Sequence, residues 1–270
     1  MQYQLQKSWL QLVRNKKINF LKEKIKKTKS VIGTWNTILD PGMVEVLASS
    51  GLDFIIIDFE HGPFRIDKVS DFVNASEIHD CSPIVRIPKN NSWMSLQALD
   101  QGAHGLMLPG VRNVKEAKYF IDQLKYSPEG QRGFSPFTKS GSFSNSDKNY
   151  KTFANNFNLS SIIIEDQEGL NNIEEILETD FLDIVYFGAY DLSQNLGFTG
   201  DVFNKNLVEK VSPAIEKVLK SGKYAGGFVP KTIEEIKFVK GLGINFITFD
   251  VDTSLVRKSY NDICNWFSLN

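Results

Sequence analysis

Residues 161–188 read SIIIEDQEGLNNIEEILETDFLDIVYFG and contain two short apolar runs on either side of a helix-like segment. The runs SIIIE and IVYFG are nearly continuous in apolar residues, as strands buried on both faces of a parallel sheet are. Between them, NIEEIL spaces its apolar residues three and four positions apart, which is typical of a helix packed by one face. The stretch therefore predicts a strand, a crossover helix and a parallel strand, connected in the right-handed sense.

Six further runs of the same kind are spread over the rest of the chain. They are VIGTW from residue 31, FIIID from 54, IVRI from 84, GLMLP from 105, YAGGF from 224 and FITFD from 246. Eight parallel strands are the number that closes a barrel. The alternative, an open doubly wound sheet, would normally carry a glycine-rich phosphate loop after its first strand, and here NTILDPG follows instead. We therefore predict an α/β fold, a (β/α)8 TIM barrel.

The length of 270 residues fits a single domain, because barrels of this class usually take about 250 residues. We assign residues 21–270 to the barrel and residues 1–20 to an N-terminal extension that is helical or partly disordered. Residues 16–29, KKINFLKEKIKKTK, are basic and amphipathic, and we expect a helix packed on the barrel, with membrane-surface binding as the alternative. Three apolar residues share its predicted stripe: Ile18, Leu21 and Ile25.

Charge and cysteine content argue against several kinds of partner. With 31 Lys and Arg against 32 Asp and Glu, the net charge is -1, so no overall field attracts nucleic acid or an anionic membrane. No apolar run reaches the roughly 18 residues of a membrane span. The two cysteines, Cys81 and Cys264, lack the spacing of a disulfide framework or a zinc site, which favours a reducing cytoplasm. We expect small molecules and other copies of the chain as partners.

Acidic side chains follow two neighbouring predicted strands at their carboxyl ends, where barrel enzymes carry their chemistry. Glu165 and Asp191 come just after strands that would run about 4.8 Å apart, so both carboxylates can reach one cation. Oxygen ligands without cysteine favour Mg or Mn, with Co as a further option. The alternative is that each carboxylate caps the next helix or pairs with a surface lysine.

Arg86 and His61 are further candidates at this end of the barrel. Arg86 follows three apolar strand residues, and a guanidinium at that depth needs a partner. It either pairs with Asp58 or Glu60 of the run DFEH, or it presents two N–H groups to a substrate carboxylate. His61 alone among the three histidines falls in an acidic cluster after a strand. A neighbouring carboxylate would fix the tautomer of its ring, as acid or base catalysis requires, although a structural role is the commoner one.

Several motifs occur in a specific order along the chain. The stretch GTWNTILDPGMVEVLASSGLDFIIIDFEHGP combines a GxW strand, a helix that starts at DP and a strand that ends in D-x-EH. It is followed by PIVRIP, ALDQGAHGLMLPGV, YSPEGQRG, IIIEDQEGLNNIEEIL, YFGAYDLSQNLG and the FDVD turn. In this order the motifs resemble the HpcH/HpaI family of metal-dependent class II aldolases. The resemblance covers the chain from about Lys22 to its C-terminus.

The resemblance implies a carbon–carbon lyase that cleaves or forms a 4-hydroxy-2-oxo acid, giving pyruvate and an aldehyde through a metal-stabilised pyruvate enolate. It implies a divalent metal, Mg, Mn or Co, on Glu165 and Asp191. It assigns acid/base catalysis to His61, with Asp58 close by and Asp100 as its carboxylate partner from a neighbouring subunit.

The resemblance also implies a substrate site and an assembly. Arg86 would hold the oxo acid and steady its enolate, and the remaining substrate contacts are Trp35, Gly188 and Ala189. The family forms hexamers in which the C-terminal helix is exchanged or packed between subunits. The apolar residues of this last segment would need such a partner, or else pack on their own barrel: Leu255, Tyr260, Ile263, Trp266 and Phe267. The long polar stretch 126–158 is expected to be a lid, a subunit contact or a flexible insert.

Three positions depart from the family pattern. Ile163 stands where a glutamine is frequent, Phe59 where a small residue is frequent, and Asp250 where a glycine is. Neutral drift is one explanation, and a change of bulk and charge at the mouth by Phe59 and Asp250 is the other. Two further functions stay open: a lyase of the same fold acting on an acyl-CoA or another hydroxy acid, with Arg132 and Lys139 as candidate phosphate contacts, and a non-catalytic metabolite-binding barrel.

Overall fold

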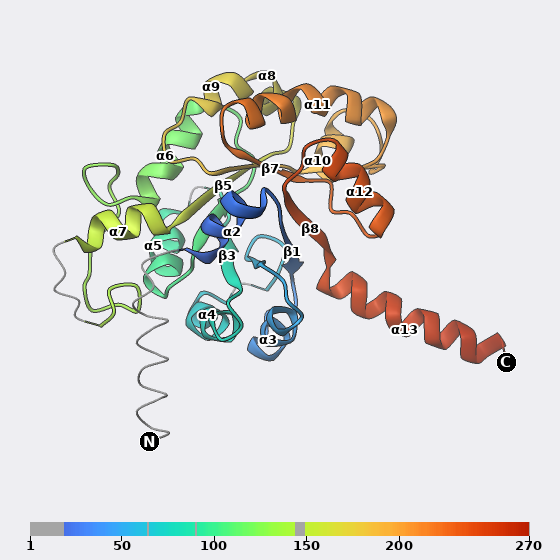
Figure 1. Cartoon of the computed structure of the whole chain (residues 1–270), viewed down its shortest axis with the longest axis horizontal. Helices are drawn as coiled ribbons and strands as arrows, with labels where there is room; N and C mark the ends of the chain where they lie inside the picture. Colours follow the sequence, from blue (N-terminus) through green and yellow to red (C-terminus); the bar gives the residue numbers. More distant parts are fainter. Residues whose placement is uncertain (1–18, 64, 90, 144–148, 270) are drawn as a thin grey trace.

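The structure, a computed structural model, describes residues 19–63, 65–89, 91–143 and 149–269, and its strands close into a barrel (Figure 1). Neighbours in sequence pair in parallel, and β8 returns to β1. The strands are β1 Val31–Asn36, β2 Phe54–Asp58, β3 Ser82–Arg86, β4 Gly105–Leu108, β5 Leu159–Ile164, β6 Ile184–Phe187, β7 Tyr224–Gly227 and β8 Phe246–Val251. All eight predicted runs form strands, so the (β/α)8 prediction is confirmed.

Helices separate the strands and surround the ring (Figure 1). They are α2 Phe20–Thr28, α3 Pro41–Ser49, η1 Ile66–Lys68, α4 Val69–Glu77, α5 Ser92–Asp100, α6 Val114–Leu124, α7 Tyr150–Phe157, α8 Gln167–Asn171, α9 Ile173–Leu177, α10 Ala189–Asn195, α11 Lys205–Lys220, α12 Ile233–Gly241 and α13 Asp252–Leu269. Local chemistry fixes several starts. Asp40 caps α3 by accepting from the Gly42 N–H, and Pro41 occupies the first turn, where its missing N–H costs nothing.

The strand residues pack in two layers, one inside the barrel and one between barrel and helices. Phe54 and Ile56 belong to the interior cluster, whereas Ile55 and Ile57 belong to the outer one, as alternation along a strand requires. Phe59 continues the outer series and is buried there. The hypothesis that Phe59 adds bulk at the mouth is therefore wrong, because the residue after Asp58 points away from the barrel axis.

Helix α2 closes the amino end of the strands, which we call the floor; the carboxyl end is the mouth. Leu21 and Ile25 are buried in the interior cluster, which confirms their predicted stripe. Figure 1 shows α2 in front of the strands at the centre of the molecule. Ile18 and the other residues up to position 18 lie outside the described residues.

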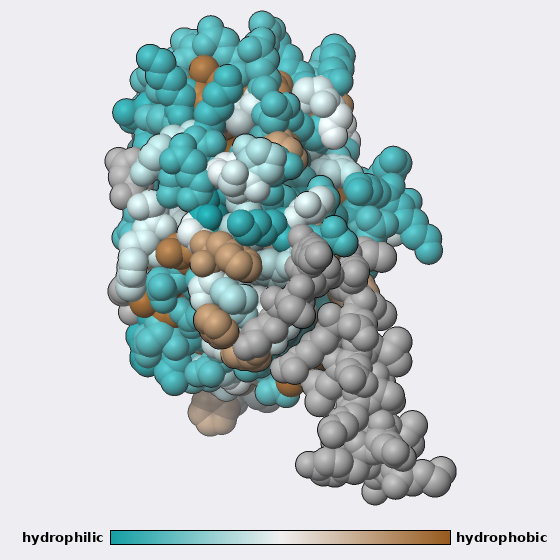
Figure 2. Space-filling view, turned by 90° about the vertical axis from the view of Figure 1, so that its left-hand side faces the viewer, coloured by the Kyte–Doolittle hydropathy of each residue, from teal (hydrophilic) through white to brown (hydrophobic). Residues whose placement is uncertain are grey.

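The stretch 126–158, expected to be a loop, contains helix α7. Its described residues lie at the floor: the Asn155 side chain accepts from the Tyr126 N–H at 2.7 Å, and the Ser140 N–H donates to the Asp100 carbonyl at 3.1 Å. These residues lie away from the mouth and so form no lid over it. Several phenylalanines of this stretch are exposed, and Figure 2 shows hydrophobic patches on the α7 side of the molecule.

Helix α13 begins against the barrel and then projects away from it (Figure 1). The Asp252 carboxylate accepts from the backbone N–H groups of Thr37 and Ile38 at 2.8–3.1 Å, which holds the start of the helix to the end of β1. Of the five predicted apolar residues, Leu255 is half-buried, and the alternative that the segment packs on its own barrel is wrong for the other four, which are exposed: Tyr260, Ile263, Trp266 and Phe267. Val256 and Leu269 are exposed as well. Within the described ranges, no helix has the length and apolar character to cross a membrane.

Candidate active site at the mouth of the barrel

A cavity of about 390 Å³ opens at the mouth, among the carboxyl ends of β1, β2, β3, β5 and β6. Nearly all of the residues predicted for the site line it together: Trp35, Asp58, His61, Arg86, Glu165, Gly188, Ala189 and Asp191. The rest of the lining is mostly apolar or aromatic: Thr37, Ile163, Tyr186, Tyr190, Val229 and Val251. An apolar pocket with a few converging polar groups is the usual form of a small-molecule site.

Arg86 ends β3 and is only 7% exposed. Its Nε donates to Asp58 Oδ1 at 2.8 Å, its Nη2 donates to Asp58 Oδ2 at 2.5 Å, and its Nη1 pairs with Glu60 Oε2 at 3.0 Å. Burial alone would lower the pKa of Arg86, but the hydrogen bonds and charge of Asp58 and the charge of Glu60 raise it above its ordinary value. A guanidinium carries five N–H donors. These contacts use one N–H on each of the three nitrogens, so the guanidinium still has N–H donors for a ligand.

Asp58 also shapes the turn that carries His61. Its Oδ1 accepts from the backbone N–H groups of Glu60 at 3.0 Å and His61 at 3.2 Å. His61 is exposed at the rim of the cavity, and its ring forms no hydrogen bond with any other residue that the structure describes. The expected carboxylate partner, Asp100, lies at the floor end of α5, where it binds Arg132 Nη2 at 2.7 Å. One chain alone therefore does not bring Asp100 to His61.

Trp35 forms one wall of the cavity through contacts with Arg86 and Tyr186. The Arg86 guanidinium lies 4.6 Å from the centre of the Trp35 ring, and the Trp35 Nε1–H donates to the Tyr186 hydroxyl at 3.1 Å. The Tyr186 hydroxyl lies 2.7 Å from the Thr248 hydroxyl. Tyr186 and Thr248 were not predicted. Their signal in the sequence is a hydroxyl within an otherwise apolar strand run, which needs a buried partner.

Glu165 follows β5 and carries the most perturbed carboxyl group of the mouth. Burial raises its pKa to about 7, with the charges of Asp191 and Glu60 acting in the same direction, while Arg86 and the Gly110 N–H oppose the rise. A Cβ atom at Gly188 would lie 2.8 Å from Glu165 Cγ, so only glycine leaves room for this side chain. A half-buried carboxyl group whose pKa is raised by neighbouring carboxylates is typical of a functional site.

Asp191 lies in the first turn of α10 and lines the same cavity as Glu165. Its charge raises the pKa of Glu165, so the two carboxylates lie close enough to interact. Both offer oxygen ligands, which suit a hard divalent cation. The described residues contain no group of three or more His, Cys, Asp or Glu side chains that could hold a metal ion. A cation here would therefore take further ligands from water or substrate.

The other two departures from the family pattern lie beside this cavity. Ile163 lines it directly and is buried. Asp250 is buried behind the wall with φ of 47°, in the left-handed region that favours glycine. Its Oδ1 accepts from the Val251 N–H at 2.8 Å, a local bond of the kind that lets aspartate adopt this conformation. Its carboxylate therefore points to the backbone and not into the cavity.

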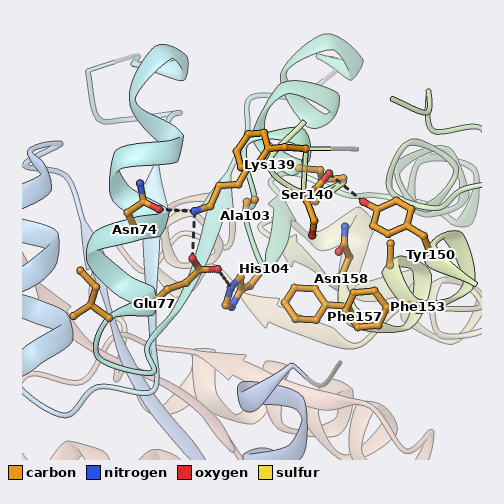
Figure 3. Close-up of a pocket in the computed structure, with 16 residues that line it drawn as sticks. Asn74, Glu77, Ala103, His104, Lys139, Ser140, Tyr150, Phe153, Phe157 and Asn158 are labelled. Carbon is orange, nitrogen blue, oxygen red and sulfur yellow. Dashed lines mark hydrogen bonds and ion pairs between the residues drawn. The ribbon is translucent and has the colours of Figure 1, made fainter. Parts of the chain in front are cut away.

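A second cavity, of about 380 Å³, lies at the floor between α4, α7 and the long connection (Figure 3). Its polar side chains bind one another: Lys139 Nζ contacts Asn74 Oδ1 at 2.8 Å and Glu77 Oε2 at 3.2 Å, and Glu77 Oε1 contacts His104 Nε2 at 3.0 Å. Arg132 is also at the floor, paired with Asp100. The two candidate phosphate contacts, Lys139 and Arg132, thus lie at the end of the barrel opposite His61, Arg86 and Glu165.

Comparison with known proteins identifies the family. The model of the HpcH/HpaI aldolase/citrate lyase family matches residues 32–259, and the chain belongs to this family. The hydroxypyruvate/pyruvate aldolase of Roseobacter denitrificans is 30% identical over 91% of this chain and 96% of that protein. The 4-hydroxy-2-oxo-heptane-1,7-dioate aldolase of Salmonella heidelberg is 30% identical over 89% of this chain and 91% of that protein.

Solved structures agree with this assignment. The citrate synthase SbnG superposes with a TM-score of 0.84 at 27% identity, covering 93% of this chain and 98% of that one. The protein CitE of Mycobacterium tuberculosis, solved in complex with magnesium and pyruvate, has a TM-score of 0.52 at 18% identity, covering 85% of this chain and 90% of that one. At that identity the likeness shows the fold alone.

Proposed function

We propose that the protein is a metal-dependent class II aldolase that cleaves, or forms, a 4-hydroxy-2-oxo acid, with pyruvate and an aldehyde as the other side of the reaction. One observation carries the proposal: the Glu165 and Asp191 carboxylates and the Arg86 guanidinium face a single cavity at the mouth. Two opposed acidic groups and a fixed cation suit an anionic ligand that also binds a metal. The two aldolases that match nearly the whole chain support the same reaction.

Glu165 and Asp191 are the residues that would hold the divalent cation, Mg, Mn or Co. The fit rests on their chemistry: both are oxygen donors, and their mutual repulsion, which helps to raise the pKa of Glu165, would be relieved by a cation. When bound, the ion supplies Lewis-acid stabilisation of the negative charge that a 2-oxo acid develops.

Arg86 holds the oxo acid through the N–H groups that Asp58 and Glu60 leave unused. Because those two carboxylates and the Trp35 ring fix the guanidinium, it is already oriented when negative charge develops on the substrate, an effect worth about 100- to 1000-fold for one such donor. The Gly188 and Ala189 backbone contacts the carboxylate of the substrate from the opposite wall, and Trp35 limits the width of the cavity.

His61 is the acid/base group of the reaction. In cleavage its ring takes the proton of the 4-hydroxyl, the C3–C4 bond breaks, and the electron pair of that bond passes into the pyruvate enolate as the aldehyde forms. The enolate then takes a proton at C3 to give pyruvate. Such proton transfer is typically worth about 100- to 10,000-fold. Asp100 of a neighbouring copy is the proposed partner of His61, because Asp100 of the same chain lies at the floor.

The protein is proposed to act as a homo-oligomer, with a hexamer as the form that the family resemblance implies. On α13, the exposed Tyr260, Ile263 and Phe267 are spaced three and four positions apart, so they form one apolar stripe. Apolar surface of this kind marks a protein interface. Light scattering at micromolar concentration should give a hexamer. A monomer at all concentrations would contradict both the assembly and the role of Asp100.

The function is tested by following pyruvate release from a panel of 4-hydroxy-2-oxo acids, with added Mn and with EDTA. Glu165→Gln and His61→Ala should abolish release. Glu168→Gln is the matched control, because Glu168 is an exposed acidic residue of α8 outside the cavity. Release that survives EDTA and both substitutions would contradict the proposal, as would failure of metal-loaded wild type to cleave any member of the panel.

A second function is that of a lyase of the same fold acting on an acyl-CoA, and the similarity to the citrate synthase SbnG is the observation that favours it. The structure offers it less support, because Arg132 and Lys139, the candidate CoA contacts, are engaged at the floor. Adding acetyl-CoA and oxaloacetate to the substrate panel distinguishes the aldolase function from this alternative. Citrate formation without pyruvate release would favour this alternative.

A further inference from the structure

Lys89 lies outside the cavity at the mouth, yet it contacts the segment that supports Glu165. It follows β3, and its Nζ donates to the Gly110 carbonyl at 2.6 Å and pairs with Glu116 Oε2 at 2.9 Å. The side chain is 31% exposed, with its stem along an outer cavity between α5 and α6. Its ammonium group is therefore committed to the connection between β4 and α6.

Gly110 joins this contact to Glu165. Its φ of 61° places it in the left-handed region, and a Cβ atom there would lie 3.3 Å from Glu165 Oε2. The Gly110 backbone also opposes the rise of the Glu165 pKa. Gly110 thus lies against the Glu165 carboxylate and turns its carbonyl toward Lys89, so the backbone conformation of one residue sets both contacts.

Glu116 completes the support from the start of α6. The same Oε2 that pairs with Lys89 accepts from the Arg112 N–H at 2.9 Å, and the Val111 N–H donates to the Ile163 carbonyl at 3.0 Å. The two residues that follow Gly110 are therefore held by neighbouring elements. Lys89 ties the Gly110 carbonyl itself.

We propose that Lys89 is a positioning residue for Glu165: its ammonium, oriented by Glu116, fixes the Gly110 peptide, which packs against the Glu165 carboxylate and so orients it toward the metal. The inference rests on the proposed metal site. Loss of this contact should first weaken the affinity for the metal. Mutation of residues that orient a metal ligand typically lowers affinity or activity by about 10- to 100-fold.

The test measures Mn²⁺ affinity without substrate, from the electron paramagnetic resonance signal of free Mn²⁺. Lys89→Met should weaken binding by about tenfold or more. Lys115→Met is the matched control, because Lys115 lines the same outer cavity from an exposed position on α6, and it should leave the affinity unchanged. Lys89→Arg keeps the charge and the N–H donors, so it should bind Mn²⁺ with most of the wild-type affinity.

Glu116→Gln provides an independent variant if Lys89→Met does not fold, and it should weaken Mn²⁺ binding because the Lys89 ammonium loses the charge that orients it. Equal affinity of wild type and both variants would overturn the positioning role. The metal proposal fails separately: it is overturned if wild type binds no Mn²⁺, or if Glu165→Gln binds it as wild type does.

Discussion

Arg86 at the mouth and Lys125 at the floor are both buried cations, and they have different kinds of partner. At the floor, Lys125 donates to the backbone carbonyls of Asn155 at 2.6 Å and Asn158 at 3.0 Å, at the end of α7. At the mouth, Arg86 binds two carboxylates beside an open cavity. Helix-end carbonyls lack intrahelical partners, so the floor cation completes a helix. The mouth instead concentrates acidic groups around a cation that keeps donors for a ligand, which is the arrangement of a binding site.

Asp191→Asn at the mouth is expected to have the largest effect on activity of all the changes at the mouth and the floor. Loss of one of two metal carboxylates should lower kcat/KM by about 1000-fold, because Lewis-acid stabilisation is worth several kcal/mol. Asp201→Asn changes a partly exposed aspartate outside the cavity and should keep full activity. Activity of Asp191→Asn within threefold of wild type would remove Asp191 from the site.

Arg86→Lys tests whether the geometry of the mouth cation matters beyond its charge. Lysine keeps the charge but cannot bind both oxygens of Asp58 and still present a fixed donor to substrate. We expect kcat to fall by about 100- to 1000-fold. Steady-state kinetics with the best substrate measures it, and kcat near the wild-type value would mean that charge alone suffices.

At the floor, Lys125→Met should change stability and leave the kcat of the folded enzyme unchanged. The Asn155 carbonyl loses the Lys125 donor and the Asn158 carbonyl keeps only Lys22, which should cost about 1–3 kcal/mol of the free energy of unfolding. Urea denaturation and kcat measured together check this pair of outcomes. A fall in kcat with unchanged stability would mean that the floor also takes part in catalysis.

The pH dependence of stability should also differ in that variant. Burial, together with the charge of Lys22, lowers the pKa of Lys125 from 10.5 to about 7. Between about pH 7 and 10.5 the unfolded chain therefore binds more protons at this residue than the folded one, so its contribution to stability rises with pH. The wild type should gain stability relative to Lys125→Met over this window. A constant difference from pH 7 to 10 would show that Lys125 stays protonated in the fold.

Tyr186→Phe should have the smallest effect, because it removes only the hydroxyl behind the wall of the mouth. Trp35 Nε1 and Thr248 lose a partner, and we expect a loss of about 1 kcal/mol in stability. The same change should lower kcat by less than tenfold, because Arg86 still holds the Trp35 ring. A loss of activity above 100-fold would place the hydroxyl in contact with substrate.

Most of the fold, and parts of the site, could be predicted from the sequence for one physical reason. Strands buried on both faces are apolar throughout, so runs such as FIIID have clear ends, and the polar residues that end or follow several of the runs mark the mouth. Contacts between residues that are far apart in the sequence leave no comparable pattern in it. Lys89 contacts Gly110, and His104 binds the Glu77 carboxylate of α4. Helix α7 was missed because polar residues surround its few apolar ones.

Strand alternation could have placed Phe59 correctly, because Asp58 faces the cavity and the next side chain must point outward. The backbone conformation at Asp250 could not have been inferred in that way. From the sequence, an aspartate in place of a glycine predicts a bulkier side chain in the cavity. In the structure, Asp250 adopts the left-handed conformation, and its carboxylate accepts from the neighbouring Val251 N–H. The partner of His61 was implied across a subunit boundary, and its position in the assembly stays a prediction.

The most direct test of the central claim, that the mouth stabilises a pyruvate enolate, is exchange of the pyruvate methyl protons for deuterium. Enolate formation removes a proton from the methyl carbon, and its reversal in D2O returns a deuteron. We predict that the methyl signal in the proton NMR spectrum disappears with Mg²⁺-loaded wild type and persists with EDTA, Glu165→Gln or Arg86→Met. Persistence of the signal with folded, Mg²⁺-loaded wild type would contradict the claim.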